Sequence, residues 1–332
     1  MNALIITEKP SVAKDIARVL KISHKKEGYF EGNGYSITWA FGHLVKLADP
    51  PAYEPSYERW QLDPLPIIPD SFILEVGQDS GVQKQFKIIQ TLLQSPHIEQ
   101  VICATDAGRE GELIFRHLYH ISQCQKPIQR LWVSSQTDEA IQEGFKHLKP
   151  GTDYDSLYEC ALSRAEADWI IGINATRAYT CRFSRGQGVM SVGRVQTPVL
   201  KMIVDRHHAV QTFKPDHFYE VEVTLVHPNG LFKGLYISDT KESRLSALEN
   251  ANTIVTHFKE SSQGIVHSYT AQTVHEKPPL LYDLTELQKD ANKLFKLSAD
   301  ETLKTMQSLY ETHKLLTYPR TSSRYLSTDL KT

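Results

Sequence analysis

An acidic turn between a short apolar run and a helical pattern constrains this chain more than any other feature. Residues 101–103 have the composition of a buried parallel strand, and apolar side chains recur over residues 113–119 at spacings typical of an amphipathic helix. The segment between them carries Asp106, Glu110 and Glu112. Ligands of open α/β sheets bind outside the carboxyl ends of the strands, so this turn is a candidate ligand site. A cation such as Mg²⁺ would relieve the repulsion among the acids. A helix start whose acids favour the macrodipole explains the same residues equally well.

A second acid follows another predicted strand. Residues 3–7 are apolar, and Pro10 suits the first position of the helix that follows, where its missing N–H costs nothing. Glu8 therefore stands at a strand end, as Asp106 does. Lys9 beside it could hold a phosphate, although a surface ion pair accounts for it as well. Alternation of strands and helices over residues 1–150, including a strand over residues 130–135, predicts a compact parallel-sheet domain. The absence of GxGxxG and P-loop patterns gives little support to a dinucleotide or ATP site.

Beyond residue 150 the pattern changes three times. Residues 151–215 are mainly helical, with a long helix from residue 154 to 178 that is expected to break near Gly172. Residues 216–278 show period-two alternation and turn signals over 217–270, which predicts an antiparallel β module. Residues 279–332 start with two helices, 284–295 and 299–310, the second capped by Ser298. The expected fold is α/β and mixed, with several domains: a parallel sheet, a helical domain, a β module and a second helical region.

Several side chains outside the two acidic turns are candidates for contact with a ligand. His43 follows a probable strand, and Trp60 lies in a proline-rich loop over residues 48–70, where it could stack on a base or anchor the loop. Arg164 and Asp168 share one helix face, which is more often structural than functional. Residues 191–196 precede Thr197 and Pro198, which predict a helix over residues 199–206 whose N-terminus could bind phosphate.

Composition counts mildly against a nucleic-acid partner and argues against a zinc site, a disulfide framework and a membrane span. The net charge is −2, with 37 Lys and Arg against 39 Asp and Glu, so a basic coat for nucleic acid is absent, although a local groove would serve the same purpose. The four cysteines are far apart without a CxxC pair, which indicates a reducing compartment and neither a zinc site nor a disulfide framework. No apolar run approaches a membrane span or a signal sequence, so a cytoplasmic enzyme is expected.

Four motifs occur along the chain in one order: Glu8-Lys9-Pro10-Ser11, Thr105-Asp106-Ala107-Gly108-Arg109-Glu110-Gly111-Glu112, Ser191-Val192-Gly193-Arg194-Val195-Gln196-Thr197-Pro198 and Thr317-Tyr318-Pro319-Arg320-Thr321. Each alone is weak, but together they resemble the type IA DNA topoisomerases, in particular the bacterial topoisomerase III branch. The likeness extends over essentially the whole chain. It implies a toprim domain for residues 1–150, the first parts of a helical DNA-binding domain and a β module, and the start of a helical domain that carries the tyrosine.

The resemblance also implies an ATP-independent reaction. Tyr318 would attack single-stranded DNA and form a 5′-phosphotyrosine, Arg320 and Lys9 would stabilise the charged phosphorane, and Glu8 would exchange a proton with the leaving 3′-oxygen. Mg²⁺ would be held by Glu8, Asp106 and Glu110. The residues expected to contact DNA are His43, Trp60, Arg164, Asp168, Trp169, Arg177, Ser191, Val192, Gly193, Arg194, Val195, Gln196 and Arg320.

The implied substrate is single-stranded DNA or a negatively supercoiled duplex, which the protein would relax or decatenate as a monomer, with a helicase as a candidate partner.

Three features depart from the common pattern. Gly108 and Ser322 stand where many members have Asp, and the chain ends fourteen residues after Tyr318, where the family continues. A N-terminal portion or a truncated form is therefore expected, with Tyr318 meeting the acids across a domain interface. The alternatives are a toprim-type metal-dependent nuclease or primase, and a non-catalytic DNA-binding remnant.

Overall fold

The computed structural model describes residues 2–261, 263–321 and 323–326. The chain divides into two compact units, one formed by Met1–Pro198 with Pro279–Thr332 and the other by Val199–Pro278. Each unit is described by itself. Ser322, whose predicted departure from the family pattern is noted above, lies outside the described residues.

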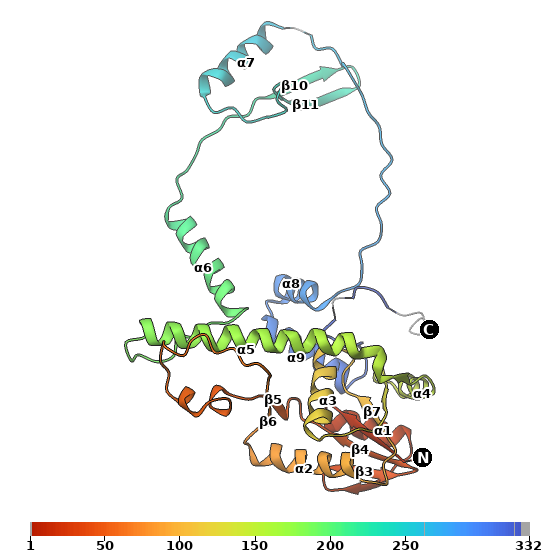
Figure 1. The fold of residues 1–332 in the computed structure, drawn as a ribbon. Coiled ribbons are helices and arrows are strands. Elements are labelled where there is room, and N and C mark those ends of the chain that lie inside the picture. Colours follow the sequence, from red (N-terminus) through yellow and green to blue (C-terminus); the bar gives the residue numbers. More distant parts are fainter. Residues whose placement is uncertain (1, 262, 322, 327–332) are drawn as a thin grey trace. The chain divides into compact units, whose positions relative to one another are not determined.

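The first unit is built on a sheet whose described strands follow the order β2-β3-β4-β1-β7-β8-β9 (Figure 1). Its centre is parallel, because β1 (Ala3–Thr7) pairs with β4 (Tyr35–Trp39) and β7 (Gln100–Ala104), and β7 pairs with β8. The edges are antiparallel. The remaining strands of this sheet are β2 (His24–Lys26), β3 (Tyr29–Gly32), β8 (Ile128–Arg130) and β9 (Lys149–Pro150).

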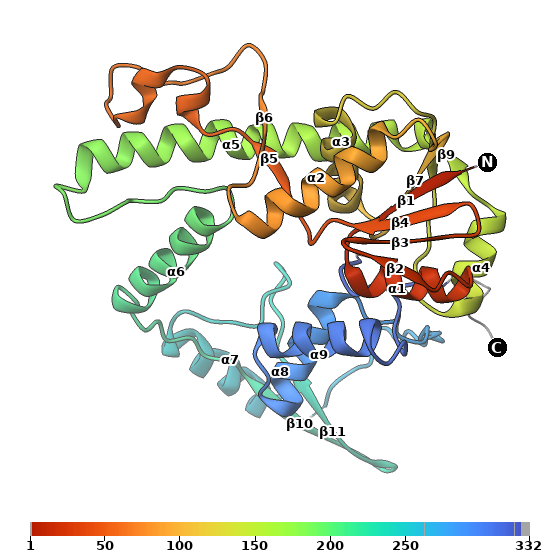
Figure 2. The ribbon, with the colours of Figure 1, turned by 90° about the horizontal axis from the view of Figure 1, so that it is seen from below.

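Helices cover both faces of this sheet (Figure 2). Leu4 and Ile6 of β1 face the core shared with α2 and α3, whereas Ile5 faces the core shared with α1 and α4. This alternation follows from the two-residue period of a strand. It confirms the predicted parallel sheet in the N-terminal region. The helices are α1 (Pro10–Val19), α2 (Ser80–Gln94), α3 (Arg109–Ile121) and α4 (Asp138–Lys146).

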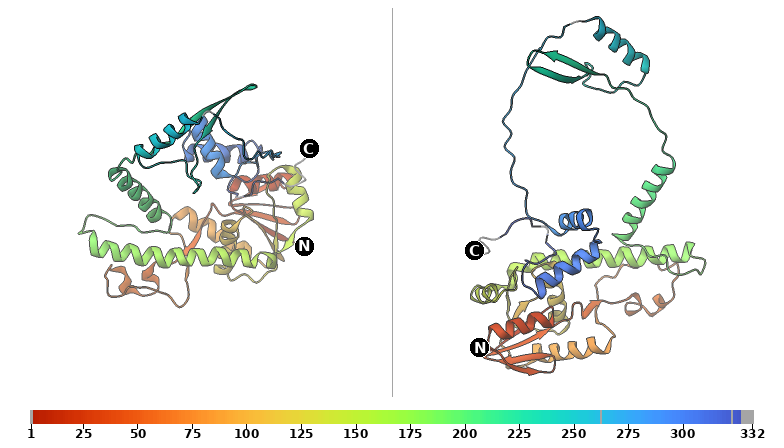
Figure 3. Two further views of the ribbon diagram at one scale, coloured as in Figure 1. Left: turned by 90° about the horizontal axis from the view of Figure 1, so that it is seen from above. Right: turned by 180° about the vertical axis from the view of Figure 1, so that it is seen from behind.

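A long helix and a proline-rich loop extend from the sheet. Helix α5 (Asp155–Phe183) runs without interruption, so the expected break near Gly172 is wrong; one glycine costs a helix only about 1 kcal/mol. The loop over residues 48–70 lies against the C-terminal half of α5 (Figure 3). The loop contains two 3-10 helices, η1 (Pro50–Ala52) and η2 (Pro55–Glu58). On either side of it, β5 (Val45–Leu47) pairs with β6 (Leu74–Val76). A third 3-10 helix, η3 (Gly151–Tyr154), precedes α5.

Two sequence predictions miss element boundaries in this unit. The strand expected over residues 130–135 is wrong, because β8 ends at Arg130 and only the Leu131 amide continues the pairing, to the Cys103 carbonyl. Helix α6 (Gln196–Gln211) begins earlier than residue 199, so Thr197 lies inside it. The Thr197 hydroxyl still accepts a hydrogen bond from the Gly193 amide at 3.1 Å, as a residue near a helix start can.

The second unit contains most of α6, a hairpin and a further helix. Strands β10 (Glu222–His227) and β11 (Gly230–Leu235) pair in antiparallel fashion around a turn at Pro228 and Asn229. Helix α7 (Leu248–Glu260) follows, so an all-β segment over residues 217–270 is wrong for this part. Ala251, Ile254, Val255 and Phe258 recur there at helical spacing, a signal that the alternation upstream obscured.

The C-terminal part of the first unit is a helical pair. Helix α8 (Leu284–Phe295) has the predicted bounds, and α9 (Ala299–Glu311) is one residue longer than predicted. Ser298 caps α9 through a capping box with Glu301, as the sequence indicated. Across the described residues, none of the helices is both long enough and apolar enough to span a bilayer.

Candidate active site

Two acids stand at neighbouring strand ends, as the sequence predicted. Strand β1 pairs with β7 so that Thr7 lies opposite Ala104, and Glu8 and Asp106 follow these two residues. The Asp106 side chain is 5% exposed, and its carboxylate lies close enough to Glu8 to act on the charge of that residue. The parallel pairing of two short apolar strands thus places two carboxylates side by side at one edge of the sheet.

The turn that carries Asp106 is fixed from beneath by buried charge. Arg130 is fully buried and donates hydrogen bonds to the carbonyls of Cys103, Thr105 and Asp106 at 2.9–3.1 Å. Its Nε lies 3.2 Å from Oε2 of Glu112, which is also buried. Gly111 completes the turn, because a Cβ there would lie 2.2 Å from the Asp106 carbonyl oxygen. Glu112 therefore supports the turn from inside the protein and lines none of the cavities described below.

Lys9 links the acidic edge to the C-terminal helical pair. Its Nζ lies 3.3 Å from Asp106 Oδ2 and 2.8 Å from Oε1 of Glu311, at the end of α9. A second lysine makes a similar connection: Lys314 Nζ lies 2.7 Å from Asp15 and 2.9 Å from Gln136. These contacts bring the end of the described chain back to the carboxyl edge of the sheet.

Tyr318 reaches the same edge. Its backbone amide donates a 3.0 Å hydrogen bond to the Ser134 carbonyl, and its half-buried ring packs edge-on against Tyr310 with centroids 5.7 Å apart. A cavity of about 100 Å³ is shared by the predicted catalytic residues Glu8, Lys9, Tyr318 and Arg320, and by Asp106, Gln307, Tyr310, Glu311 and Pro319. The side chains that the sequence singled out from both ends of the chain therefore meet, and this space is called the acid cavity below.

Burial and charge shift the pKa values of Glu8 and Tyr318 in the acid cavity. Burial raises the pKa of Glu8 to about 7, and the nearby Asp106 charge raises it further, against the opposing influence of Lys9. Burial also raises the pKa of Tyr318 to about 12, again reinforced by Asp106, whereas Arg320 and Lys9 act to lower it. Near neutral pH Glu8 can therefore carry a proton, and the Tyr318 phenol is protonated.

The predicted metal ligands do not all gather. Glu110 turns to Arg164 and His43, whose Nη1 and Nε2 atoms lie 3.5 and 3.6 Å from its carboxylate. Within the described ranges, no three His, Cys, Asp or Glu side chains are grouped as ligands of one ion. Glu8 and Asp106 alone fit Mg²⁺, which often takes one or two carboxylates and completes its shell with water and phosphate oxygens.

Two further cavities adjoin along α5, and together they are called the α5 groove. They measure about 460 and 570 Å³ and share Asp49, Asp168 and Trp169. His43, Glu110 and Arg164 line the first, and Trp60, Arg177, Ser191 and Val192 line the second. Eight of the predicted DNA contacts thus border one continuous groove. Of the other predicted contacts, Gly193, Arg194, Val195 and Gln196 adjoin it in sequence, and Arg194 Nε lies 2.6 Å from Asp168.

Three of these groove residues also have structural partners. The Trp169 indole donates to the Ala48 carbonyl at 2.9 Å, and the buried Arg177 donates to the Tyr57 carbonyl at 2.6 Å. The Arg177 guanidinium lies 5.2 Å from the Trp60 ring centre, so Trp60 helps to anchor its loop while 41% of the residue stays exposed. The two interpretations of Trp60 that the sequence left open are therefore compatible.

Comparison with known proteins gives the family of this chain. A model of the Toprim domain matches residues 3–136, and a model of the DNA topoisomerase family matches residues 152–332, more than half of the chain. This chain belongs to the type IA DNA topoisomerases. It is 46% identical over 339 aligned residues to DNA topoisomerase 3 of Bacillus cereus (strain ATCC 10987 / NRS 248), covering 99% of this chain and 44% of the relative.

Other topoisomerases give the same picture. The identity is 45% over 329 residues with DNA topoisomerase 3 of Bacillus subtilis (strain 168), which also covers 99% of this chain and 44% of the relative. The structure of full-length topoisomerase I from Thermotoga maritima superposes with a TM-score of 0.64 at 22% identity, over 99% of this chain and 51% of that one, which shows a shared fold. This topoisomerase chain spans less than half the length of the curated relatives it matches.

Sequence reasoning missed four residues of the topoisomerase site. Arg130, Tyr310 and Glu311 gave no local signal, because their partners lie far away in the sequence. His117 is buried, lines the α5 groove, and has two ring nitrogens without a hydrogen-bond partner in the described structure. Burial lowers the pKa of His117 to about 4. Its position seven residues after Glu110, on the same helix face, was the signal that could have found it.

Proposed function

We propose that this chain carries the strand-cutting and rejoining centre of a type IA DNA topoisomerase. The reaction is a transient break in single-stranded DNA through a covalent bond to Tyr318, without ATP. One observation carries the proposal: Tyr318 and Arg320 line the same small cavity as Glu8, Lys9 and Asp106, although these three precede Tyr318 by 310, 309 and 212 residues (318 − 8, 318 − 9 and 318 − 106).

The chemistry follows from the side chains of the acid cavity. The Tyr318 oxygen attacks the phosphorus and gives up its proton to solvent water, the bond from phosphorus to the 3′-oxygen breaks, and a 5′-phosphotyrosine forms. Lys9 and Arg320 offset the charge that develops on the phosphate oxygens and favour the tyrosinate. Protonated Glu8 donates its proton to the leaving 3′-oxygen and takes it back when the strand is rejoined. The covalent bond conserves the energy of the phosphodiester, so resealing needs no ATP.

Mg²⁺ is the proposed cofactor. Glu8 and Asp106 would hold it, and the bound ion would supply positive charge that steadies the DNA phosphate during rejoining. Glu110, turned to Arg164 and His43, would reach the ion only after a change of side-chain conformation.

The α5 groove is the proposed path of the single strand. Aromatic and guanidinium groups alternate along it, with Trp60 and Arg177 in one cavity and Arg164 and Trp169 in the other. Such groups stack on bases and neutralise phosphates without regard to sequence. A negatively supercoiled duplex offers single-stranded regions, and relaxation or decatenation would follow. A monomeric state and a helicase partner follow from the family resemblance, and a cytoplasmic location is the expectation drawn from the sequence; all three belong to the same proposal.

A pair of matched tyrosine variants tests the assignment. Tyr318→Phe should abolish the denaturant-resistant adduct between the protein and a single-stranded oligonucleotide. Tyr310→Phe, in the same cavity, should still form the adduct because the Tyr310 phenol is buried, which raises its pKa and holds it in the protonated form. An adduct that persists in Tyr318→Phe would refute the assignment. Free 5′-phosphate products without protein-linked DNA would favour a metal-dependent nuclease instead.

A further inference from the structure

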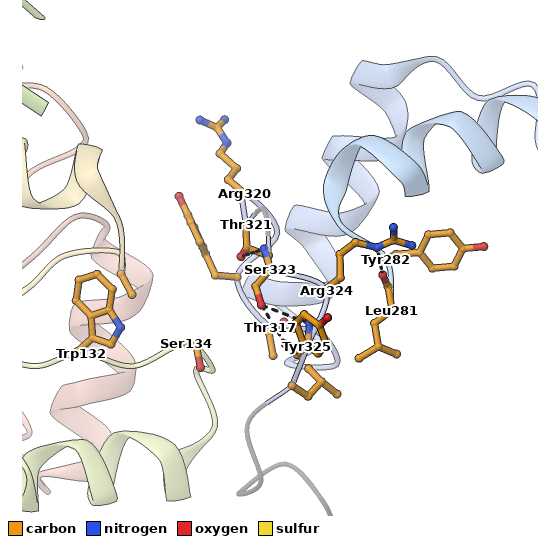
Figure 4. A pocket seen from close by; sticks show the side chains of 13 residues that line it. Trp132, Ser134, Leu281, Tyr282, Thr317, Arg320, Thr321, Ser323, Arg324 and Tyr325 are labelled. Atoms are coloured by element: carbon orange, nitrogen blue, oxygen red, sulfur yellow. Dashed lines mark hydrogen bonds between the residues drawn. The ribbon is translucent and has the colours of Figure 1, made fainter. Parts of the chain in front are cut away.

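We propose that a second cavity beside Tyr318 binds the nucleotide that becomes linked to this tyrosine, an inference that rests on the proposed function. The cavity measures about 460 Å³, and its walls include Trp132, Ser134, Tyr282, Thr317, Tyr318 and Thr321 (Figure 4). It is called the tyrosine-side cavity. Its ligand is a nucleotide of single-stranded DNA, bound through an aromatic face and hydroxyl groups.

Its position relative to the acids defines which nucleotide it would take. The tyrosine-side cavity and the acid cavity share Tyr318 and Arg320, and the acids Glu8 and Asp106 line only the acid cavity. In the proposed reaction the 3′-oxygen departs toward Glu8, whereas the phosphate and the nucleotide on its other side stay with Tyr318. The strand that remains attached therefore continues away from the acids, where the tyrosine-side cavity lies.

Volume supports the same assignment. Ligand pockets in proteins usually measure about 300–1,000 Å³. The acid cavity, at about 100 Å³, has room for a phosphate and its charges but not for a nucleoside. The tyrosine-side cavity, at about 460 Å³, falls within the range of pockets that enclose a ligand of nucleotide size.

Trp132 gives this cavity a rigid stacking surface. Its ring stacks on Tyr154 with centroids 4.9 Å apart and planes 23° apart, and the Arg130 guanidinium lies 4.9 Å from its centre. Although these neighbours hold the ring, 37% of Trp132 remains exposed. Stacking of a base on an aromatic ring is tolerant of sequence, because every base has a π-face.

Polar groups around the stacking surface suit a sugar and a phosphate. The hydroxyl-bearing residues Ser134, Thr317 and Thr321 line the cavity, and hydroxyls are common donors to the sugar and phosphate in protein complexes with DNA. Arg320 is exposed, makes no ion pair or hydrogen bond with another described residue, and extends away from Ser323 and Arg324 in Figure 4. Arg324 is already occupied, since its Nε donates to the Leu281 carbonyl at 2.8 Å.

The test pairs a protein variant with a modified oligonucleotide. The cleavage position is first mapped on an oligonucleotide with the unaltered chain, and an abasic site is then placed either directly 3′ or directly 5′ of the cleaved phosphate. Binding is measured by fluorescence anisotropy, and adduct yield by denaturing gel. We expect Trp132→Ala to weaken binding of the intact oligonucleotide about tenfold, within the range for the loss of one stacked base. Trp132→Phe should restore most of that loss.

The abasic sites separate stacking at this cavity from a general effect. With the base missing on the 3′ side, the unaltered chain and Trp132→Ala should bind alike, whereas with the base missing on the 5′ side the difference should remain. Equal losses from Trp132→Ala with every oligonucleotide, or no loss with any, would overturn the inference. If the unaltered chain forms adducts but Trp132 has no influence, only this inference fails; if no adduct forms at all, the proposed function fails.

Discussion

The acid turn, residues 105–112, and the tyrosine segment, residues 312–321, supply two halves of one site by opposite means. Below the acid turn lies a buried network in which Arg130 and Glu112 fix both the backbone and its charges. The tyrosine segment contains neither helix nor strand. Among the described residues, its main polar links to the sheet are the Lys314 ammonium and the Tyr318 amide. The neighbouring residue Glu311 adds an ion pair with Lys9. One half is fixed by the core, and we expect the other half to separate from it more readily.

This difference has a functional meaning for a strand-cutting site. Charges that must stabilise a phosphate work best when they are fixed before the reaction, because no energy is then spent on orienting them. A tyrosine that carries one end of a cut strand must instead be able to move away from the end held at the acids. We therefore expect substitutions in the acid turn to act on the stability of the whole sheet domain, and those in the tyrosine segment to act on local opening.

The largest expected effect comes from the buried network. Arg130→Leu removes the guanidinium and leaves the carboxylate of Glu112, whose side chain is 1% exposed, with Arg116 as its only remaining ion-pair partner among the described residues. Loss of one partner of a buried pair costs about 3–5 kcal/mol, and the carbonyls of the acid turn would lose their donor as well. Urea unfolding should show this loss in the free energy of unfolding.

Arg18→Leu is the matched control, because Arg18 pairs with Asp15 and Asp138 at the surface. Its loss should be several times smaller, as is usual for exposed pairs. Equal effects of the two substitutions would show that the buried network does not hold the acid turn.

The next effect is a change in the pH dependence of stability. Because the folded-state pKa of Glu8 is raised to about 7 from an unfolded value near 4.5, the folded chain binds more protons in this window. Stability should therefore fall as pH rises from 4.5 to 7, by about 2 kcal/mol for this group. In metal-free buffer, Glu8→Gln should remove this part of the slope.

The difference between the two unfolding curves isolates Glu8. His117, whose pKa is lowered to about 4, acts in the opposite direction, but it contributes equally to both proteins. A difference that stays constant from pH 4.5 to 7.5 would mean that Glu8 titrates normally and is not buried beside Asp106.

The smallest expected effect is local. Lys314→Met removes the bonds to Asp15 and Gln136 and should leave the urea midpoint of the sheet domain nearly unchanged. The Tyr318 amide, bonded to the Ser134 carbonyl, should then exchange its hydrogen about tenfold faster, the equivalent of about 1.4 kcal/mol of local opening. Lys304→Met, which breaks the exposed pair with Asp300 on α9, serves as the control. Unchanged exchange in Lys314→Met would contradict a separable tyrosine segment.

Local patterns predicted the elements whose signals act within a few residues better than the elements whose extent depends on packing. The apolar runs of β1 and β7, the proline at the start of α1 and the capping residue of α9 all act within a few residues, so their consequences could be predicted from sequence. The break expected at Gly172 and the strand beyond Arg130 failed because packing decided them. A glycine signals a weakness in a helix, but α5 is supported on both sides of Gly172, where Trp169, Asn174 and Thr176 donate to the carbonyls of Ala48, Ile67 and Val192.

The candidate site was predictable in its residues but not in its distances. Motif order alone linked Glu8, Asp106 and Tyr318, whereas no local pattern indicated that Glu311 would contact Lys9 or that Glu110 would turn to His43. Such contacts depend on how the helical pair packs on the sheet edge. Arg130 was inconspicuous for a similar reason, since a lone arginine in a short strand gives no sign that it is buried.

Identification of the residue that becomes linked to DNA tests most directly whether both halves form one active site. The chain is incubated with a single-stranded oligonucleotide, the adduct is digested with protease and nuclease, and the nucleotide-bearing peptide is sequenced by mass spectrometry. We predict that the remnant is a 5′-phosphate ester on Tyr318, formed by the unaltered chain and strongly reduced in Lys9→Ala. A remnant on another residue, or full adduct yield after the loss of Lys9, would contradict a site shared between the acid turn and the tyrosine segment.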